Sequence, residues 1–276
     1  MRINHNIAAL NSHRQLTSNN ATASKNMEKL SSGLRINRAG DDAAGLSISE
    51  KMRGQIRGLE MASKNSQDAI SLIQTAEGAL NETHSILQRM RELAVQGAND
   101  TNVTTDRTAI TNEYTELANE VNRISAQTEF NTQKLLDGNP AVATTGLNFQ
   151  IGANTGQTLN LKIGAMDSAS LKVDTGSVQL DTNANATAGI AKLDTAIETV
   201  SAERSKLGAN QNRLEHTINN LGTSAENLTA AESRIRDVDM AKEMMEFTKN
   251  NILTQAAQAM LAQANQQPQG VLQLLR

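Results

Sequence analysis

The stretch MRGQIRGLEMASKNSQDAISLIQTAEGALNETHSILQRMRELAVQ, residues 52–96, carries an apolar repeat of seven residues. The repeated positions are Met52, Leu59, Ser66, Ile73, Leu80, Leu87 and Ala94. Because such a repeat keeps these side chains on one side of a helix, it predicts a long helix with a packing seam. We expect the helix to begin at SISE, where Ser47 and Glu50 can form a capping box, and to end near Gly97. A helix of this length measures roughly 75 Å.

Two more segments show helical spacing of their apolar residues. The apolar positions of the shorter one are Ile110, Tyr114, Leu117, Val121 and Ile124. It follows the turn-rich GANDTNVTTD, so it predicts an antiparallel return helix. The longer segment runs from Ile190 to Ile235 and contains Gly208 and Gly222, each of which costs about 1 kcal/mol relative to alanine in a helix. These segments predict a mainly α fold.

Between these two segments the apolar period changes from helical spacing to strict alternation. The alternating residues are Leu147, Phe149 and Ile151, then Leu159, Leu161 and Ile163, with GANTGQ between them. This pattern predicts a β-hairpin. Two short apolar runs follow, one at Leu171 and Val173 and one at Val178 and Leu180, separated by the Gly-Ser of DTGS. They predict an extension of the small sheet.

Both ends of the chain are amphipathic. The first stripe starts at Ile3, Ile7 and Leu10, passes through Leu16, Ala23, Met27 and Leu30 to Leu34, and breaks at NRAGDDAAG, where Asp41 and Asp42 are expected to cap a turn. The last stripe contains Ile252, Leu253, Ala256, Ala257, Met260, Leu261 and Ala264, and apolar residues continue beyond Pro268. An apolar stripe at a chain end needs a surface that buries it.

The two end segments consist largely of Ala, Gln, Asn and Ser, so two such helices pairing alone would bury little apolar surface. At about 25 cal/mol per Å² the gain barely matches an ordering cost of about 1.5 kcal/mol per residue. We therefore expect the ends to be poorly ordered in one copy and helical when many copies pack together.

The composition excludes several classes of protein. Cysteine is absent, which excludes disulfides, thiolate catalysis and Cys-ligated zinc. A formal net charge of −3 does not suggest nucleic acid or an anionic membrane as partner, and no apolar run is long enough for a membrane span. The start MRINHNIAAL lacks the features of a secretory signal, so export by another route is expected.

The sequence carries no motif for a catalytic, metal or cofactor site. The four histidines are scattered without metal-ligand spacing, and neither a phosphate-binding loop nor a nucleophile turn occurs. We therefore expect no enzyme activity, no metal and no cofactor. The stretch LQRMRELAVQGAND, residues 87–100, is distinctive in another way, since Gln88, Arg89, Glu92, Leu93 and Gln96 are expected on the outer helix surface, with Leu93 exposed among polar groups.

Several stretches resemble bacterial flagellins. They are MRINHNIAALNS at the start, SSGLRINRAGDDAAGLSISEKMRGQIRGL, LIQTAEGALNETHSILQRMRELAVQ, QTEFNTQKLLDG, FQIGANTGQT, and QANQQPQGVLQLLR at the end. The resemblance covers roughly residues 1–165 and 188–276. Flagellin is the structural subunit that self-assembles into the extracellular flagellar filament, so the resemblance implies motility as the biological role.

The resemblance also implies an architecture, with long antiparallel helices forming a coiled-coil-like bundle, a small β-hairpin region, and N- and C-terminal helices paired in the filament core. Residues 1–40 with 236–276 would form the inner domain, 41–137 with 188–235 an outer helical rod, and 138–187 a short variable region. The implied inner-core polymerisation residues are Ile3, Ile7, Leu10, Leu30, Leu34, Ile252, Ala256, Met260, Leu272 and Leu275.

The resemblance implies partners as well. Flagellins are exported unfolded through the flagellar type III system, with an export chaperone at the C-terminal helix, and they meet filament cap and hook–filament junction proteins. Flagellins similar to this chain are bound as monomers by a Toll-like receptor of the animal host. The matching positions here are Arg89, Leu93 and Glu113, with Gln88 and Gln96 nearby.

Two other hypotheses belong to different classes. The chain could be a secreted helical effector or adhesin that acts as a monomer, and seeded polymerisation separates this hypothesis from a filament subunit. An enzyme is the third hypothesis, and its site would have to be built from scattered Asp, Glu and His residues without a supporting motif.

Overall fold

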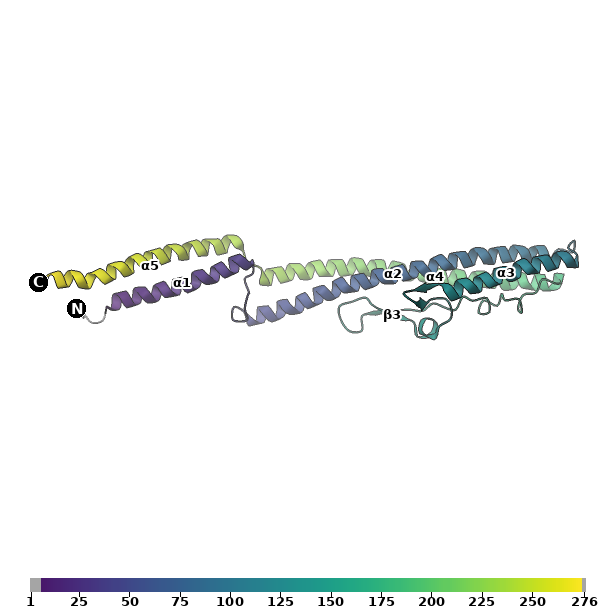
Figure 1. Cartoon of the computed structure of the whole chain (residues 1–276), viewed down its shortest axis with the longest axis horizontal. Helices are drawn as coiled ribbons and strands as arrows, with labels where there is room; N and C mark the ends of the chain where they lie inside the picture. Colours follow the sequence, from purple (N-terminus) through teal and green to yellow (C-terminus); the bar gives the residue numbers. More distant parts are fainter. Residues whose placement is uncertain (1–5, 275–276) are drawn as a thin grey trace. The chain divides into compact units, whose positions relative to one another are not determined.

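The computed structural model describes residues 6–274 of the chain, with side chains as far as residue 266. Its helices are α1 (Ile7–Ser32), α2 (Ala43–Gly97), α3 (Thr104–Gln127), α4 (Asn183–Arg236) and α5 (Met240–Leu274), with a π-helical turn at Ala141–Thr145. Its strands are β1 (Glu129–Phe130), β2 (Gln133–Lys134), β3 (Leu147–Gln150) and β4 (Thr158–Leu161). The mainly α prediction is confirmed (Figure 1).

The chain divides into two compact units. The terminal unit falls within Met1–Gly54 and Asn227–Arg276, and the rod unit is Gln55–Glu226. Helices α2 and α4 each have residues in both units.

In the rod unit, α2, α3 and α4 pack around one apolar core. The predicted seam residues Ile73, Leu80, Leu87 and Ala94 of α2 are all fully buried in it. The ion pairs Arg91 with Asp194 (2.6 Å) and Arg204 with Glu77 (3.9 Å) show that α2 and α4 run antiparallel, because the residue numbers fall along one helix as they rise along the other. The expected antiparallel packing of the long helices is therefore confirmed in this unit.

The predicted start of α2 at Ser47 is wrong, since the helix begins at Ala43. Asp42 caps it instead, with its Oδ1 accepting the Gly45 N–H at 2.8 Å. Gly45 makes this cap possible, because a Cβ there would lie 2.4 Å from the Asp42 carboxylate and 2.8 Å from Ile36. Asp41 caps the preceding turn by accepting the N–H groups of Asn37 and Arg38, so the structural role expected for the two aspartates is confirmed.

The predicted hairpin is confirmed. Strands β3 and β4 are antiparallel, with Leu147 opposite Leu161 and Phe149 opposite Leu159. The hairpin tip sits closely on α2, because a Cβ on Gly58 would lie 2.9 Å from the Cβ of Ala153. In addition, Asn65 Nδ2 donates to the Gln150 carbonyl at 3.1 Å. A second small hairpin, β1–β2, was not predicted, and its turn residues Asn131 and Thr132 both have positive φ.

The predicted extension of the sheet is wrong. Leu171, Val173, Val178 and Leu180 are buried, but they lie in turns and irregular backbone rather than strands. The Asp167 carbonyl accepts the Leu171 N–H, and the Asp174 carbonyl accepts the N–H groups of Ser177 and Val178, so the backbone closes into turns instead of extending. The apolar side chains of these turns therefore join the core of the rod unit without a β-ladder.

Tyr114, the single tyrosine of the chain, fastens these turns to α3. Its hydroxyl donates to the Val173 carbonyl at 2.7 Å. Burial, and to a smaller extent the Asp174 carboxylate, raise the pKa of Tyr114 above its ordinary value of 10.0. Because the folded-state pKa is the higher one, the stability linked to this proton is fully present below pH 10.0 and is lost as pH rises towards the folded-state pKa.

We expect phenolate absorbance to appear only at a pH above that of free tyrosine, together with unfolding of the rod unit. Tyr114→Phe should lower the free energy of unfolding at neutral pH by about 1 kcal/mol and should abolish the extra loss of stability at high pH. The measurement is an absorbance titration followed in parallel by circular dichroism. A phenolate that forms at the ordinary tyrosine pKa while the helices stay intact would contradict the prediction.

In the terminal unit, α1 and α5 form an antiparallel pair (Figure 1). At one end Leu34 forms a β-bridge with Asp237, and the Val238 N–H donates to the Gly33 carbonyl at 3.0 Å. At the other end Asn6 Nδ2 donates to the Ala264 carbonyl at 2.7 Å. The contacts at the two ends are separated by nearly the same number of residues on α1 as on α5, so the two helices keep one alignment along their whole contact.

Candidate assembly surfaces

The contact between α1 and α5 follows a heptad repeat, which we call the terminal seam. It comprises Ala9, Ser12, Leu16, Asn19, Ala23, Asn26 and Leu30 of α1 and Glu243, Phe247, Asn250, Thr254, Ala257, Leu261 and Ala264 of α5, all half-buried or buried. Most of these side chains are small or polar. The pair therefore buries little apolar surface between its own helices.

Large apolar side chains lie outside the seam, and we call them the exposed apolar set. They are Ile7, Leu10 and Met27 of α1 and Met240, Met244, Met245, Ile252, Leu253 and Met260 of α5. Leu10 is 72% exposed, Ile252 61% and Met260 63%. Large apolar residues gathered on exposed surface mark interaction sites. A shallow groove in the same region is lined by Met244, Met245, Thr248, Lys249, Ile252 and Leu253.

The predicted inner-core residues take different places in this pair. Ile7, Leu10, Ile252, Ala256 and Met260 are exposed, whereas Leu30 and Leu34 are half-buried. Leu272 lies in the helical backbone of α5. Ile3 and Leu275 lie outside the described residues.

A second surface surrounds Arg89 on α2 of the rod unit. The guanidinium donates from Nε (3.0 Å) and Nη2 (2.8 Å) to one carboxylate oxygen of Glu113 on α3, and from Nη1 to Glu92 at 2.9 Å. The Glu113 hydrogen bonds are the largest cause that raises the pKa of Arg89. Gln88, Gln96 and Glu113 are exposed around it. The sequence-predicted polar residues are thus brought together, but solvent weakens their ion pairs.

The predicted exposure of Leu93 is wrong, because only 1% of this residue is exposed. Helix α2 contacts both α3 and α4 here, so it buries a wider stripe than a two-helix seam would. Leu87, Met90, Leu93 and Ala94 all belong to this stripe. Leu93 therefore stabilises the helices beneath the Arg89 surface rather than forming part of it.

Two family models match most of the chain. The bacterial flagellin N-terminal helical region matches residues 3–141, and the bacterial flagellin C-terminal helical region matches residues 190–275. The chain belongs to the bacterial flagellin family. As a flagellin, it is a structural subunit of the extracellular flagellar filament and not an enzyme.

Known flagellins are similar over the full length of the chain. The flagellin of Bacillus subtilis is 63% identical over 304 aligned residues, which cover 100% of both chains. The flagellar filament 33 kDa core protein of Treponema phagedenis is 51% identical over 286 residues, again covering 100% of both. The crystal structure of Bacillus cereus flagellin, at 40% identity and a TM-score of 0.50, covers 61% of this chain and 94% of that one.

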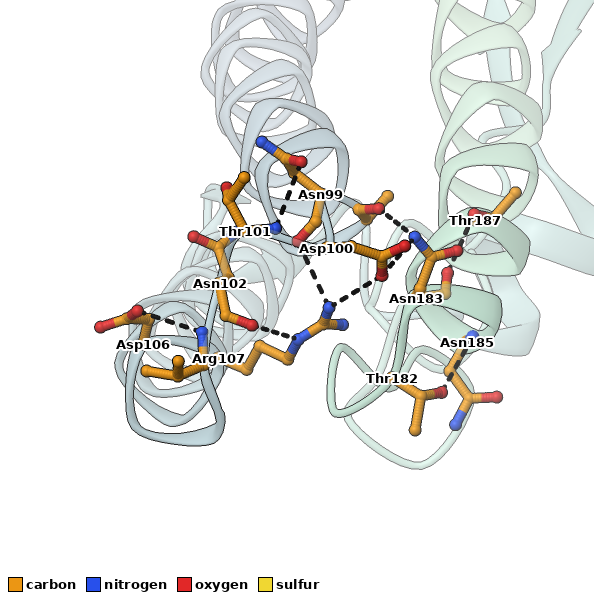
Figure 2. A network of polar contacts seen from close by, with 12 residues as sticks. Asn99, Asp100, Thr101, Asn102, Asp106, Arg107, Thr182, Asn183, Asn185 and Thr187 are labelled. Atoms are coloured by element: carbon orange, nitrogen blue, oxygen red, sulfur yellow. Dashed lines mark hydrogen bonds and ion pairs between the residues drawn. The ribbon is translucent and has the colours of Figure 1, made fainter.

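Sequence reasoning missed one polar network of this flagellin, where the ends of α2, α3 and α4 meet (Figure 2). Arg107 Nε and Nη2 donate to the carbonyls of Asn102 and Asn99, both at 3.3 Å, and Nη2 lies 3.6 Å from the Asp100 carboxylate. Asn183 of α4 donates to the same carboxylate at 3.1 Å and also to the Ala98 carbonyl. The network therefore pairs carbonyls of the connector between α2 and α3, which follow the last residue of α2.

The sequence did contain a signal for this network. Arg107 precedes Ile110 and Tyr114 at helical spacing, so it stands on the apolar stripe of α3. A charged residue on such a stripe is buried when the fold supplies it with partners.

Within residues 6–274, none of the helices combines the length and the apolarity needed to cross a lipid bilayer.

Proposed function

We propose that residues 1–40 with 236–276 form the inner tube of the filament, that residues 41–137 with 188–235 form an outer tube of rods, and that residues 138–187 form a short variable surface. The observation that carries this proposal is the contrast between the small, polar terminal seam and the exposed apolar set around it. Side chains such as Leu10 and Ile252 lose contact with water only when further helices pack against the pair.

Seeded polymerisation tests the inner-tube assignment. Purified chain mixed with filament fragments should elongate them, and deletion of residues 250–276 should stop elongation while the helices of the rod unit remain folded by circular dichroism. Growth of the truncated chain at the rate of the full chain would contradict the assignment, and a full chain that never elongates seeds would favour the monomeric effector or adhesin.

The proposal extends to the route out of the cell. We propose export as an unfolded chain through the flagellar type III system, with an export chaperone covering the C-terminal helix and with filament cap and hook–filament junction proteins as later partners. The groove at Met244, Met245, Ile252 and Leu253 supports the chaperone proposal, since it offers apolar surface on α5. A chain without cysteine also has no disulfide that would hinder unfolding before export.

We further propose that a host Toll-like receptor binds the monomer at the Arg89 surface, formed by Gln88, Arg89, Gln96 and Glu113 over the buried Leu93. The exposure of the four polar residues supports this, together with the similarity of the chain to flagellins. Because Leu93 is buried, its contribution would be to hold α2 and α3 in place under the surface.

The double substitution Arg89→Ala and Glu113→Ala should lower receptor activation by purified monomer about 30-fold, the loss typical of two interface residues at a binding hot spot. The readout is a reporter assay in cells that carry the receptor. Arg123→Ala with Glu120→Ala is the matched control, since it removes another exposed ion pair of the rod unit and should leave activation unchanged. Equal loss from both double variants, or none from the first, would contradict the proposal.

A further inference from the structure

Asn26 is the most deeply buried polar side chain of the terminal unit's helix pair, with only 4% of the residue exposed. With its amide nitrogen turned towards the available acceptors, it donates to the Thr22 carbonyl and to Glu243 Oε1, both at 3.1 Å. Its amide oxygen then accepts from Asn250 Nδ2, also at 3.1 Å. We call Asn26, Glu243 and Asn250 the Asn26 cluster.

The rest of the terminal seam resists sliding only in part. Its residues repeat every seventh position and include Ala9 and Ala23 on α1 and Ala257 and Ala264 on α5. A shift of α5 by one heptad puts Ala264 in the place of Ala257 at little cost, although it also puts Thr254 in the place of Phe247, which loses apolar contact. The β-bridge of Leu34 with Asp237 holds one end of the pair, and the hydrogen bond from Asn6 to the Ala264 carbonyl holds the other.

The Asn26 cluster does distinguish the registers. A shift of one heptad in one direction brings Ala257 to the position of Asn250, and alanine offers no side-chain hydrogen bond. A shift in the other direction places Asn26 against the connector that precedes Met240, where α5 begins. In either case a buried amide loses partners, at a cost of about 1–3 kcal/mol.

The register decides which exposed apolar side chains of α1 and α5 lie at the same height along the helix pair. Counting inwards by equal steps from the Asn6 and Ala264 contact brings Leu10 level with Met260, and counting from the Leu34 and Asp237 bridge brings Met27 level with Met244. A one-heptad shift would separate such partners by about 10 Å. A neighbouring subunit would then meet a different surface.

We propose that the Asn26 cluster acts with the contacts at the two ends of the pair to select the register of α1 against α5, and so decides which exposed apolar side chains a second copy of the chain meets together. The last part rests on the proposed function of the terminal helices, whereas the register itself does not. Buried asparagines at seam positions select one pairing among similar ones at some cost in stability, which is the role assigned here.

Cysteine cross-linking tests the register, because the natural chain has no cysteine to interfere. Asn6→Cys with Ala264→Cys reports the observed register, and His13→Cys with Ala264→Cys reports a shift of one heptad. A short thiol-reactive cross-linker should join the first pair about tenfold more than the second. In chains that also carry Asn26→Leu, the two yields should come within about twofold, while helix content stays the same or rises.

Asn19→Leu is the matched control, because Asn19 occupies the same heptad position one repeat earlier and its side chain forms no hydrogen bond to the described residues. It should keep the tenfold preference and normal seeded growth, whereas Asn26→Leu should slow seeded growth about tenfold. The proposal is overturned if Asn26→Leu keeps the preference, or if it loses the preference but grows normally. Failure of the unsubstituted chain to elongate seeds would instead contradict the proposed function, and cross-linking would still decide the register.

Discussion

Replacing Leu10, Ile252 and Met260 together by glutamate is expected to slow seeded filament growth at least about 100-fold without unfolding the monomer. All three residues are exposed in the single chain, so charge at these positions costs little there. In the proposed inner tube the same positions are enclosed by other copies, and an unpaired charge removed from water costs several kcal/mol. The penalty recurs in every subunit added.

The measurement is the initial rate of growth on native seeds, with circular dichroism of the monomer alongside. Gln15→Glu, Gln255→Glu and Gln258→Glu together form the control, since they add the same charge to exposed polar positions of the same two helices. We expect this control to slow growth much less than the first triple variant. Comparable inhibition by both would show that net charge, rather than burial of the exposed apolar set, governs assembly.

The second large effect concerns the stability of the rod unit. Arg107→Met should lower its free energy of unfolding by about 2–3 kcal/mol, because the carbonyls of Asn99 and Asn102 and the Asp100 carboxylate lose a shared donor. The side chain of Arg107 is only 10% exposed, whereas that of Asp100 is 84% exposed, so the loss is expected at the two carbonyls rather than at the carboxylate. Methionine keeps similar bulk, which limits the loss of packing.

Chemical denaturation of the two variants gives the comparison. Arg123→Met is the control on the same helix, and its exposed ion pair with Glu120 should contribute less than about 1 kcal/mol. If Arg107→Met unfolds at the same denaturant concentration as Arg123→Met, the network at the helix ends does not stabilise the rod unit.

The long helices and the β-hairpin were predictable because their signals are periodic. The heptads of α2 depend on spacing alone, as does the alternation of Leu147 with Phe149 on one strand and of Leu159 with Leu161 on the other. Spacing of this kind can be read from the sequence. The turns around Leu171 and Val178 show where this reasoning stops, because short buried runs have the same composition in a strand and in a turn. There the Asp174 carbonyl decides the structure by closing a turn.

The surfaces were predictable only in part. The polar residues around Arg89 follow from their positions on α2, but the burial of Leu93 depends on a third helix that arrives from a distant part of the chain. The division of the terminal stripes was not predictable either. It depends on which face each of the two helices turns towards the other, and this puts Leu16 and Leu261 in the seam and leaves Leu10 and Met260 outside.

Peroxide footprinting of the methionines shows whether the exposed apolar set is buried only between copies of the chain. Met27, Met244, Met245 and Met260 report on this set, whereas the fully buried Met90 is an internal reference. We expect rapid sulfoxide formation at the first four in the monomer, strong protection of them in the filament, and slow oxidation of Met90 in both. Equal oxidation of Met27, Met244, Met245 and Met260 in monomer and filament would contradict this expectation.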